Sequence, residues 1–192
     1  MSKQAIVVAG PNGAGKSAFA YEYLESHRCR YVSADVIAEA MAGGSIDEVR
    51  VEAGRRFFEC LGEEIRKGDD LVVESTLSGL TFKRVIAEMK DAGYSVTIVF
   101  VFLGSAEACV ARIRERVLKG GHPVREEDVR RRFGRSIRNF WHEYRHLADN
   151  WHLCYNGGVQ FHDVASGERA RVDVRDEGLL DVFLGIIGKE RR

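Results

Sequence analysis

A glycine-rich loop near the start of the chain reads Gly10-Pro11-Asn12-Gly13-Ala14-Gly15-Lys16-Ser17. It fits the phosphate-loop pattern G-x-x-x-x-G-K-[ST]. The short apolar run Ala5–Ala9 precedes the loop, and a helical pattern begins at about Lys16. A buried strand before the loop and a helix after it are the context that separates a nucleotide-binding loop from a chance match. The sequence therefore predicts a phosphate site here rather than a glycine-rich turn without a ligand.

The residue types of the loop suit ATP and Mg²⁺. Glycines let the backbone curl until several N–H groups point at the phosphates, and the helix N-terminus adds partial positive charge. Lys16 is predicted to reach the β- and γ-phosphates, and the Ser17 hydroxyl is predicted to bind Mg²⁺. The residues expected to bind the nucleotide are Gly10, Pro11, Asn12, Gly13, Ala14, Gly15, Lys16 and Ser17.

Beyond the loop, apolar runs alternate with helical patterns. Strands are predicted at Arg30–Ser33, Leu71–Glu74, Ser95–Phe102 and Trp151–Tyr155, with helices between them. This order predicts an α/β fold, with a P-loop kinase-type parallel sheet flanked by helices on both faces. We expect one domain over residues 1–192, and it ends in a hairpin and a helix at about 159–190. The hairpin strands are predicted to flank a turn at Ser166-Gly167.

Two acidic residues follow predicted strands, where parallel sheets gather their ligands. Asp35 follows the second strand and is a candidate general base for a substrate hydroxyl, or a plain helix N-cap. Glu74 ends the run Leu71–Glu74 and is predicted to bind substrate or to act on Mg²⁺ through water, unless it is only an exposed charge. Thr76 follows Glu74 and is a further candidate for substrate binding, or for capping the next helix.

An arginine-rich segment is predicted to form a helical lid at about 112–146. Residues 112–145 hold eleven Lys or Arg and five Asp or Glu, which is a local excess of six positive charges. Arginines stabilise the charge of a transferring phosphoryl group, and Arg116 and Arg132 are the candidates for this catalytic role. The others are expected to form a solvated helix face. His122, after the turn Gly120-Gly121, is a candidate for substrate contact, although a loop histidine is more often merely exposed.

Composition excludes several classes of protein. Lys plus Arg and Asp plus Glu both number 29, so the net charge is zero and long nucleic acid is not an expected partner. The four cysteines are far apart and lack metal-ligand spacing, which favours reduced thiols. The first apolar run is too short for a signal peptide or a membrane span. A cytoplasmic protein without a membrane partner is expected.

These motifs together resemble the zeta-toxin family of P-loop small-molecule kinases, in a compact zeta-like branch. Besides the phosphate loop, the resemblance rests on seven further segments over roughly residues 4–157. They are Ser33-Ala34-Asp35, Glu74-Ser75-Thr76-Leu77-Ser78-Gly79, Ala92-Gly93-Tyr94, Arg112 to Val117, Gly120-Gly121-His122, Arg130-Arg131-Arg132-Phe133 and Tyr155-Asn156. One difference is that the toxins carry a lid arginine just after the arginine-bearing helix, whereas here the arginines come later, at Arg130 to Arg132.

The resemblance implies an ATP-dependent kinase that phosphorylates a hydroxyl of a small molecule, with UDP-N-acetylglucosamine as the acceptor of the toxin branch. It implies that Asp35 is the base, that Glu74 binds substrate and that Arg116 contacts phosphate. An antitoxin-like protein partner would follow if the chain is a toxin. Two alternatives remain open: a kinase of a nucleoside, simple sugar or nucleic-acid end, and an ATPase or nucleotide switch without a small-molecule acceptor.

Overall fold

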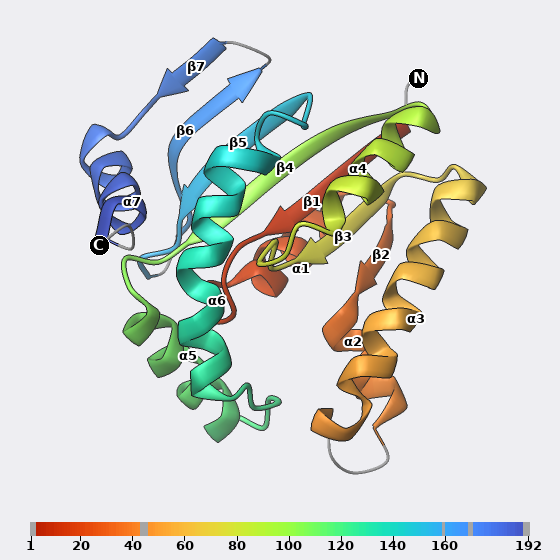
Figure 1. Cartoon of the computed structure of the whole chain (residues 1–192), viewed down its shortest axis with the longest axis horizontal. Helices are drawn as coiled ribbons and strands as arrows, with labels where there is room; N and C mark the ends of the chain where they lie inside the picture. The colour runs from red at the N-terminus through yellow and green to blue at the C-terminus, as the bar shows by residue number, and fades with distance from the viewer. Residues whose placement is uncertain (1–2, 43–45, 159, 169–170, 190–192) are drawn as a thin grey trace.

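Seven strands form one sheet in the order β2-β3-β1-β4-β5-β6-β7 (Figure 1). The computed structural model describes residues 3–42, 46–158, 160–168 and 171–189. The first five strands in this order are parallel, whereas β6 and β7 run antiparallel to their neighbours. The strands are β1 Lys3–Ala9, β2 Arg30–Ser33, β3 Leu71–Ser75, β4 Tyr94–Phe102, β5 Asn150–Tyr155, β6 His162–Glu168 and β7 Arg171–Val174.

Helices cover both faces of the sheet. As a result β1 is buried on both sides, and its residues alternate between two cores. Ala5, Val7 and Ala9 pack in the larger core with α3, α4, α6 and α7, whereas Ile6 and Val8 pack in a smaller core with α1. The helices are α1 Lys16–Ser26, α2 Ala34–Met41, α3 Ile46–Lys67, α4 Phe82–Asp91, α5 Ala106–Leu118, α6 Glu126–Asn139 and α7 Glu177–Lys189, with a π-helical turn at Phe140–Tyr144. The predicted fold class is confirmed.

Most predicted elements lie where the pattern put them, and the exceptions have physical reasons. The helical segment predicted at about 112–146 is divided, because α5 ends at Leu118 and α6 ends at Asn139, where it passes into the π-helical turn. Two aromatic side chains of this turn, Phe140 and Tyr144, are fully buried. No helix in the described part of the chain combines the length and the apolar character needed to cross a membrane.

The predicted turn at Ser166-Gly167 is wrong. Both residues lie inside β6, which continues to Glu168. Gly167 pairs with Trp151 of β5, and a Cβ at Gly167 would lie 2.4 Å from the indole ring. The glycine is therefore required by close packing within a strand rather than by a turn. β6 and β7 extend the main sheet instead of forming a separate appendage. Val159, the predicted start of the hairpin, lies outside the described residues.

Only part of the segment predicted as a lid, at about 112–146, lies beside the site. Val129, Phe133 and Ile137 of α6 are buried in the large core. Hydrogen bonds also tie this helix to the loop after β3, where Ser136 Oγ donates to the carbonyl of Thr76 and Asn139 Nδ2 donates to that of Leu77 at 2.9 Å. The parts that border the site are Arg112 and Arg116 of α5, the loop between α5 and α6, and Arg132 of α6. The buried face of α6 belongs to the scaffold.

Candidate active site

The phosphate loop joins β1 to α1 at the carboxyl ends of the parallel strands, and its shape depends on glycine. Gly13 and Gly15 have φ angles of 83° and 103°, which side chains other than glycine rarely adopt. A Cβ at Gly15 would lie 2.2 Å from Nδ2 of Asn156. This amide follows β5 and donates to the carbonyl of Ala14 at 2.9 Å. The loop is therefore braced from across the sheet in the curled shape that a phosphate site needs.

A buried polar network surrounds Glu74 at the end of β3. Lys16 Nζ lies 3.7 Å from Glu74 Oε1, and both side chains are about 5% exposed. Ser17 Oγ donates to Glu74 Oε1 at 3.2 Å, and the phenol of Tyr31 in β2 donates to Oε2 at 2.7 Å. Burial and the neighbouring carboxylate raise the pKa of Tyr31, so the phenol stays a donor. The structure thus places Lys16, predicted to bind phosphate, and Ser17, predicted to bind Mg²⁺, in contact with Glu74.

The oxygen donors of this network fit Mg²⁺. The Ser17 hydroxyl and a Glu74 carboxylate oxygen are 3.2 Å apart beside the phosphate loop. Mg²⁺ prefers oxygen ligands and is usually bound through one or two protein groups, with water and substrate phosphates completing its shell. Ser17 and Glu74 are the residues that could hold it, directly or through water.

Asp35 begins α2 and meets the loop at the end of α5. His122 Nε2 lies 3.7 Å from Asp35 Oδ2, and His122 Nδ1 lies 2.5 Å from an oxygen of Glu39, one turn along α2. Arg116 donates to the carbonyl of His122 at 2.8 Å. Contact with His122 lowers the pKa of Asp35, with help from the charges of Lys16 and Arg116 and against the effect of burial. The same contact raises the pKa of His122. Asp35 is therefore a charged acceptor at neutral pH.

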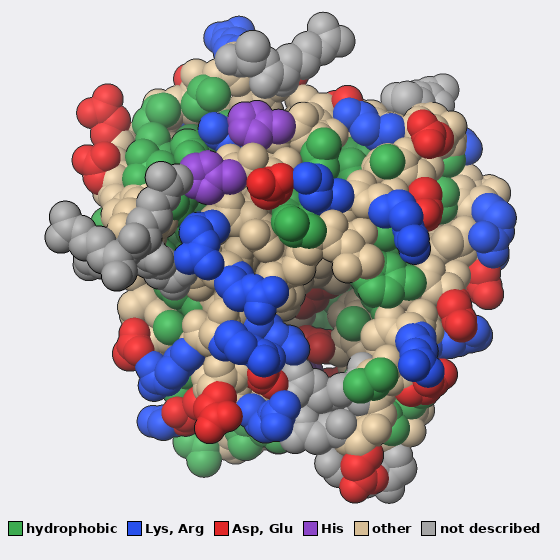
Figure 2. Space-filling view, viewed as in Figure 1, with side chains coloured by type: hydrophobic (Ala, Val, Ile, Leu, Met, Phe, Trp, Pro, Cys, Tyr) green, Lys and Arg blue, Asp and Glu red, His purple; other side chains and the backbone are tan. Residues whose placement is uncertain are grey.

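Two cavities meet at this point. The larger, about 460 Å³, is lined by the phosphate loop and by Glu74 and Arg116, among others. The smaller, about 170 Å³, lies among α2, α3, α6 and the loop after α5. Asn12, Asp35 and His122 line both cavities. Figure 2 shows a hollow beside the basic side chains over α6, with acidic side chains at its depth. The arrangement provides a phosphate site and a second compartment on the two sides of one carboxylate.

The arginines of the basic segment divide into two groups. Arg112 and Arg116 line the large cavity, and Arg132 lines the small one. The outer arginines pair with acidic side chains: Arg114 with Glu126, Arg130 with Glu107 and Glu126, and Arg125 and Arg131 with Asp128. The expectation that most of this cluster forms a charged helix surface agrees with these ion pairs.

Thr76 lies apart from the other predicted site residues. Its hydroxyl shares a 3.0 Å hydrogen bond with Ser78, and its carbonyl accepts from Ser136 of α6. It lines neither of the two cavities that meet at Asp35. The geometry makes Thr76 part of the junction between β3 and α6, and its predicted contact with substrate stays a prediction.

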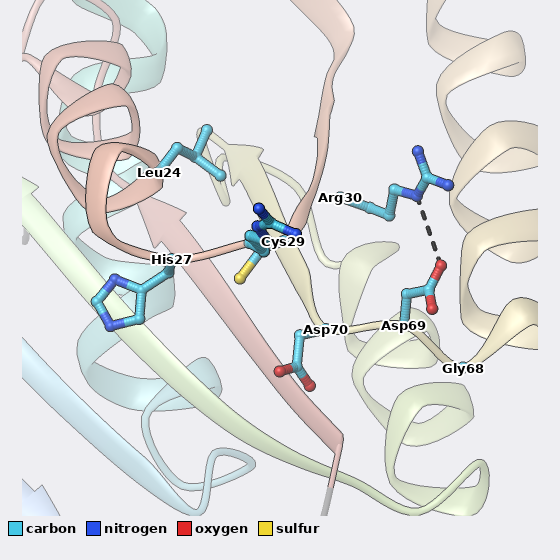
Figure 3. Close-up of a pocket in the computed structure, with 8 residues that line it drawn as sticks. Leu24, His27, Cys29, Arg30, Gly68, Asp69 and Asp70 are labelled. Atoms are coloured by element: carbon cyan, nitrogen blue, oxygen red, sulfur yellow. Dashed lines mark hydrogen bonds and ion pairs between the residues drawn. The ribbon is translucent and has the colours of Figure 1, made fainter.

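A third hollow lies at the wrong end of the sheet for this chemistry. Figure 3 shows it between the end of α1 and the start of β3, with Cys29, Arg30 and Asp70 around it. Arg30 pairs with Asp69 at 3.5 Å, and Asp70 accepts from the backbone N–H of Gln4 at 2.8 Å. Ligands of parallel sheets bind beyond the carboxyl ends of the strands, whereas this hollow lies at the amino ends of β2 and β3. Its polar groups fasten neighbouring segments together.

Two site residues escaped the sequence analysis. Tyr31 lies within β2, where an aromatic residue is the ordinary expectation for a strand. Glu39 lies on α2 as one acidic residue among many. One signal in the sequence could have indicated Tyr31 as a site residue. It lies two residues before the end of β2, the strand that leads to Asp35. The register aligns Ser33 with Glu74 and therefore brings Tyr31 onto the same side as Glu74.

Comparison with known proteins identifies the family and the fold. The model of the AAA domain family AAA_33 matches residues 6–137. An uncharacterized protein of Haemophilus influenzae (strain ATCC 51907 / DSM 11121 / KW20 / Rd) is 28% identical over 133 residues, which make up 69% of this chain and 94% of that protein.

Solved structures share the architecture. A chain of the AvrRxo1-ORF1:-ORF2 complex with ATP aligns with a TM-score of 0.71 and 18% identity, over 97% of this chain and 64% of that one. A chain of the PezAT chromosomal toxin–antitoxin system of Streptococcus pneumoniae aligns with a TM-score of 0.67 and 16% identity, over 96% of this chain and 79% of that one. The chain thus spans just under two thirds of the AvrRxo1 chain that it matches. At these identities the likeness establishes a shared α/β P-loop fold, in agreement with the zeta-toxin-like motifs.

Proposed function

The chain belongs to the AAA domain family AAA_33, and we propose that it is an ATP-dependent kinase that transfers the γ-phosphate to a hydroxyl of a small molecule. One observation carries the proposal: Asp35, Lys16 and Ser17 line one cavity, together with Arg116. A carboxylate that can accept a hydroxyl proton thus faces the groups that can hold the γ-phosphate. Phosphoryl transfer depends mainly on positioning and on electrostatic stabilisation, and this arrangement can provide both.

In the proposed mechanism, the backbone N–H groups of the phosphate loop bind the phosphates of ATP. Lys16, which is buried beside Glu74, exchanges its contact with the carboxylate for one with the γ-phosphate. Ser17 and Glu74 hold Mg²⁺, which neutralises phosphate charge when bound. Arg116 Nε is buried and has no hydrogen-bond partner within the described part of the chain, so a phosphate oxygen would satisfy it.

Asp35 is proposed to orient the acceptor hydroxyl and to take its proton as the oxygen attacks the γ-phosphorus, while the bond from that phosphorus to the bridging oxygen breaks and ADP leaves with the electron pair. For this, the imidazole of His122 must yield its place 3.7 Å from Oδ2 to the acceptor. A charged carboxylate is the form that accepts a hydrogen bond from a hydroxyl. Arg112 and Arg116 then face the charge that develops on the transferred group.

The zeta-toxin resemblance offers UDP-N-acetylglucosamine as an acceptor and an antitoxin-like protein as a partner. The solved relatives include complexes described as AvrRxo1-ORF1:-ORF2 and as a toxin–antitoxin system, which supports including such a partner in the proposal. We propose a cytoplasmic location as well, since a reducing compartment suits the four cysteines, which are all free.

The test is transfer from γ-labelled ATP, with Mg²⁺, to a panel of hydroxyl compounds that includes UDP-N-acetylglucosamine. The expected result is label on one acceptor with wild-type protein and none with Asp35→Ala, while both proteins bind ATP equally. Equal transfer by Asp35→Ala would remove Asp35 as the base. Slow ATP hydrolysis that no acceptor accelerates would favour a nucleotide switch over a kinase.

A further inference from the structure

The small cavity beside Asp35 has the features of an acceptor site. It shares Asn12, Asp35 and His122 with the phosphate cavity, so a molecule inside it would be next to the proposed base. Arg132 brings a guanidinium to it from α6. The other walls include Ala38 of α2 and Ala53 and Gly54 of α3. Small residues leave open the space that bulkier helix residues would fill.

The polar groups on its walls call for a ligand with hydroxyls and a negative charge. Asn12 is 8% exposed, and its Oδ1 has no hydrogen-bond partner among the described residues. Nε2 of His122 is also buried; it lies 3.7 Å from Asp35 Oδ2 and makes no hydrogen bond to the described residues. Buried amide and imidazole groups are rarely left unpaired, so these atoms point to a ligand that carries hydroxyls. A guanidinium suits a carboxylate or phosphate group, which it can bind through two parallel hydrogen bonds.

The size of the cavity limits the ligand. Its volume is about 170 Å³. Pockets for drug-sized ligands hold about 300–1,000 Å³. A nucleotide sugar needs a pocket of that larger class, whereas a short-chain polyol with one acidic group suits the smaller space.

We propose that the acceptor is a compact anionic polyol, a sugar acid or a small sugar or polyol phosphate, that binds in this small cavity with its acidic group on Arg132 and one hydroxyl on Asp35. The inference rests on the proposed kinase function and specifies its substrate class. It also gives Arg132 a role other than contact with the phosphates of ATP. Arg132 becomes a residue that determines specificity for the acceptor.

Gly54 allows a direct steric test. A Cβ at this helical position meets no atom within 4 Å, so a leucine can begin there without strain on the backbone, and Gly54 lines the cavity. Gly62 in the same helix is the matched control, because a Cβ there comes no closer than 3.6 Å to a flexible arginine side chain and Gly62 does not line the cavity. Both substitutions raise helix propensity, so both variants should fold.

Binding is measured by calorimetry with Mg²⁺ and a non-hydrolysable ATP analogue, and transfer is measured with labelled ATP. The probes are D-gluconate, glycerol 3-phosphate, neutral D-glucose and UDP-N-acetylglucosamine. We expect gluconate or glycerol 3-phosphate to bind and to be phosphorylated by wild type and by Gly62→Leu, and to do neither with Gly54→Leu. The carboxylate and phosphate probes distinguish the two kinds of acid. Arg132→Gln should raise KM for the anionic acceptor on the order of tenfold with little change in kcat.

The possible failures differ from one another. Transfer to UDP-N-acetylglucosamine or to glucose at wild-type rate by Gly54→Leu would overturn the small-cavity site and leave the kinase standing. Binding of an anionic polyol that Gly54→Leu abolishes, without any transfer, would support the site and overturn the kinase. If neither anionic probe binds to wild type, the inferred substrate class is wrong.

Discussion

Glu74→Gln is the most informative single substitution, because it removes one negative charge and keeps the shape of a buried network. Glu74 and Lys16 lie 3.7 Å apart at about 5% exposure. Loss of one partner from a buried ion pair costs about 3–5 kcal/mol. The amide of glutamine can still accept from Tyr31 and Ser17, so we expect a loss near 3 kcal/mol in the free energy of unfolding. For a chain of this length, that lowers Tm by roughly 6–12 °C without nucleotide.

The same substitution should change how ATP binding depends on Mg²⁺. In the wild type, Glu74 competes with the γ-phosphate for Lys16 and repels it. Unit charges about 4 Å apart interact by roughly 4 kcal/mol at an effective dielectric constant of ~20. Relief of part of this repulsion should let Glu74→Gln bind Mg²⁺-free ATP about tenfold more tightly than wild type, while Mg²⁺ improves its affinity less.

Calorimetry with and without Mg²⁺, together with thermal unfolding, measures both effects. Glu88→Gln is the matched control, since Glu88 pairs with Arg84 on an exposed helix face, where such pairs contribute only about 0.3–0.5 kcal/mol. If Glu74→Gln has the Tm of wild type and an unchanged affinity for Mg²⁺-free ATP, the reasoning about this network is refuted.

Three further predictions concern the other side chains of the site. Lys16→Ala should lose most ATP affinity or turnover, and wild-type behaviour in a titration and a transfer assay would contradict the phosphate-loop assignment. Asp35→Asn should keep ATP binding and lower the transfer rate by about 10²–10⁴-fold, measured at saturating acceptor; a smaller loss would leave Asp35 only a positioning role. His122→Gln should lower Tm most near pH 6. The pKa of His122, ordinarily 6.5, is raised, so its contribution to stability is complete below pH 6.5 and is lost as the pH rises through the raised pKa. The pKa of Asp35, ordinarily 3.8, is lowered, so its contribution is present above pH 3.8 and is lost as the pH falls through the lowered pKa. Equal Tm differences at pH 6 and pH 8.5 would show that contact of His122 with Asp35 and Glu39 does not depend on charge.

The fold was predictable because its signals are local. Fully apolar runs such as Ala5–Ala9 specify strands buried on both faces, and glycines with positive φ mark the turn between β1 and α1. The hairpin was not predictable in the same way. Ser166-Gly167 is a good turn sequence, but the ring of Trp151 on the neighbouring strand needs the space at Gly167. A contact between residues sixteen positions apart decides that glycine's role, and no local pattern reveals it.

The same distinction separates the two halves of the site. The nucleotide half is built from backbone shape and from a lysine and a serine at fixed spacing, so its motif can be read directly and is shared with proteins of the same fold. The proposed acceptor half depends on the small size of Ala38, Ala53 and Gly54, which leaves the cavity open. Small residues within helices are common for many reasons, and their meaning emerges only when α2, α3 and α6 are placed around Asp35. A resemblance carried by motifs can therefore identify the phosphate donor with more force than the acceptor, and the acceptor must be argued from the shape and charge of the small cavity.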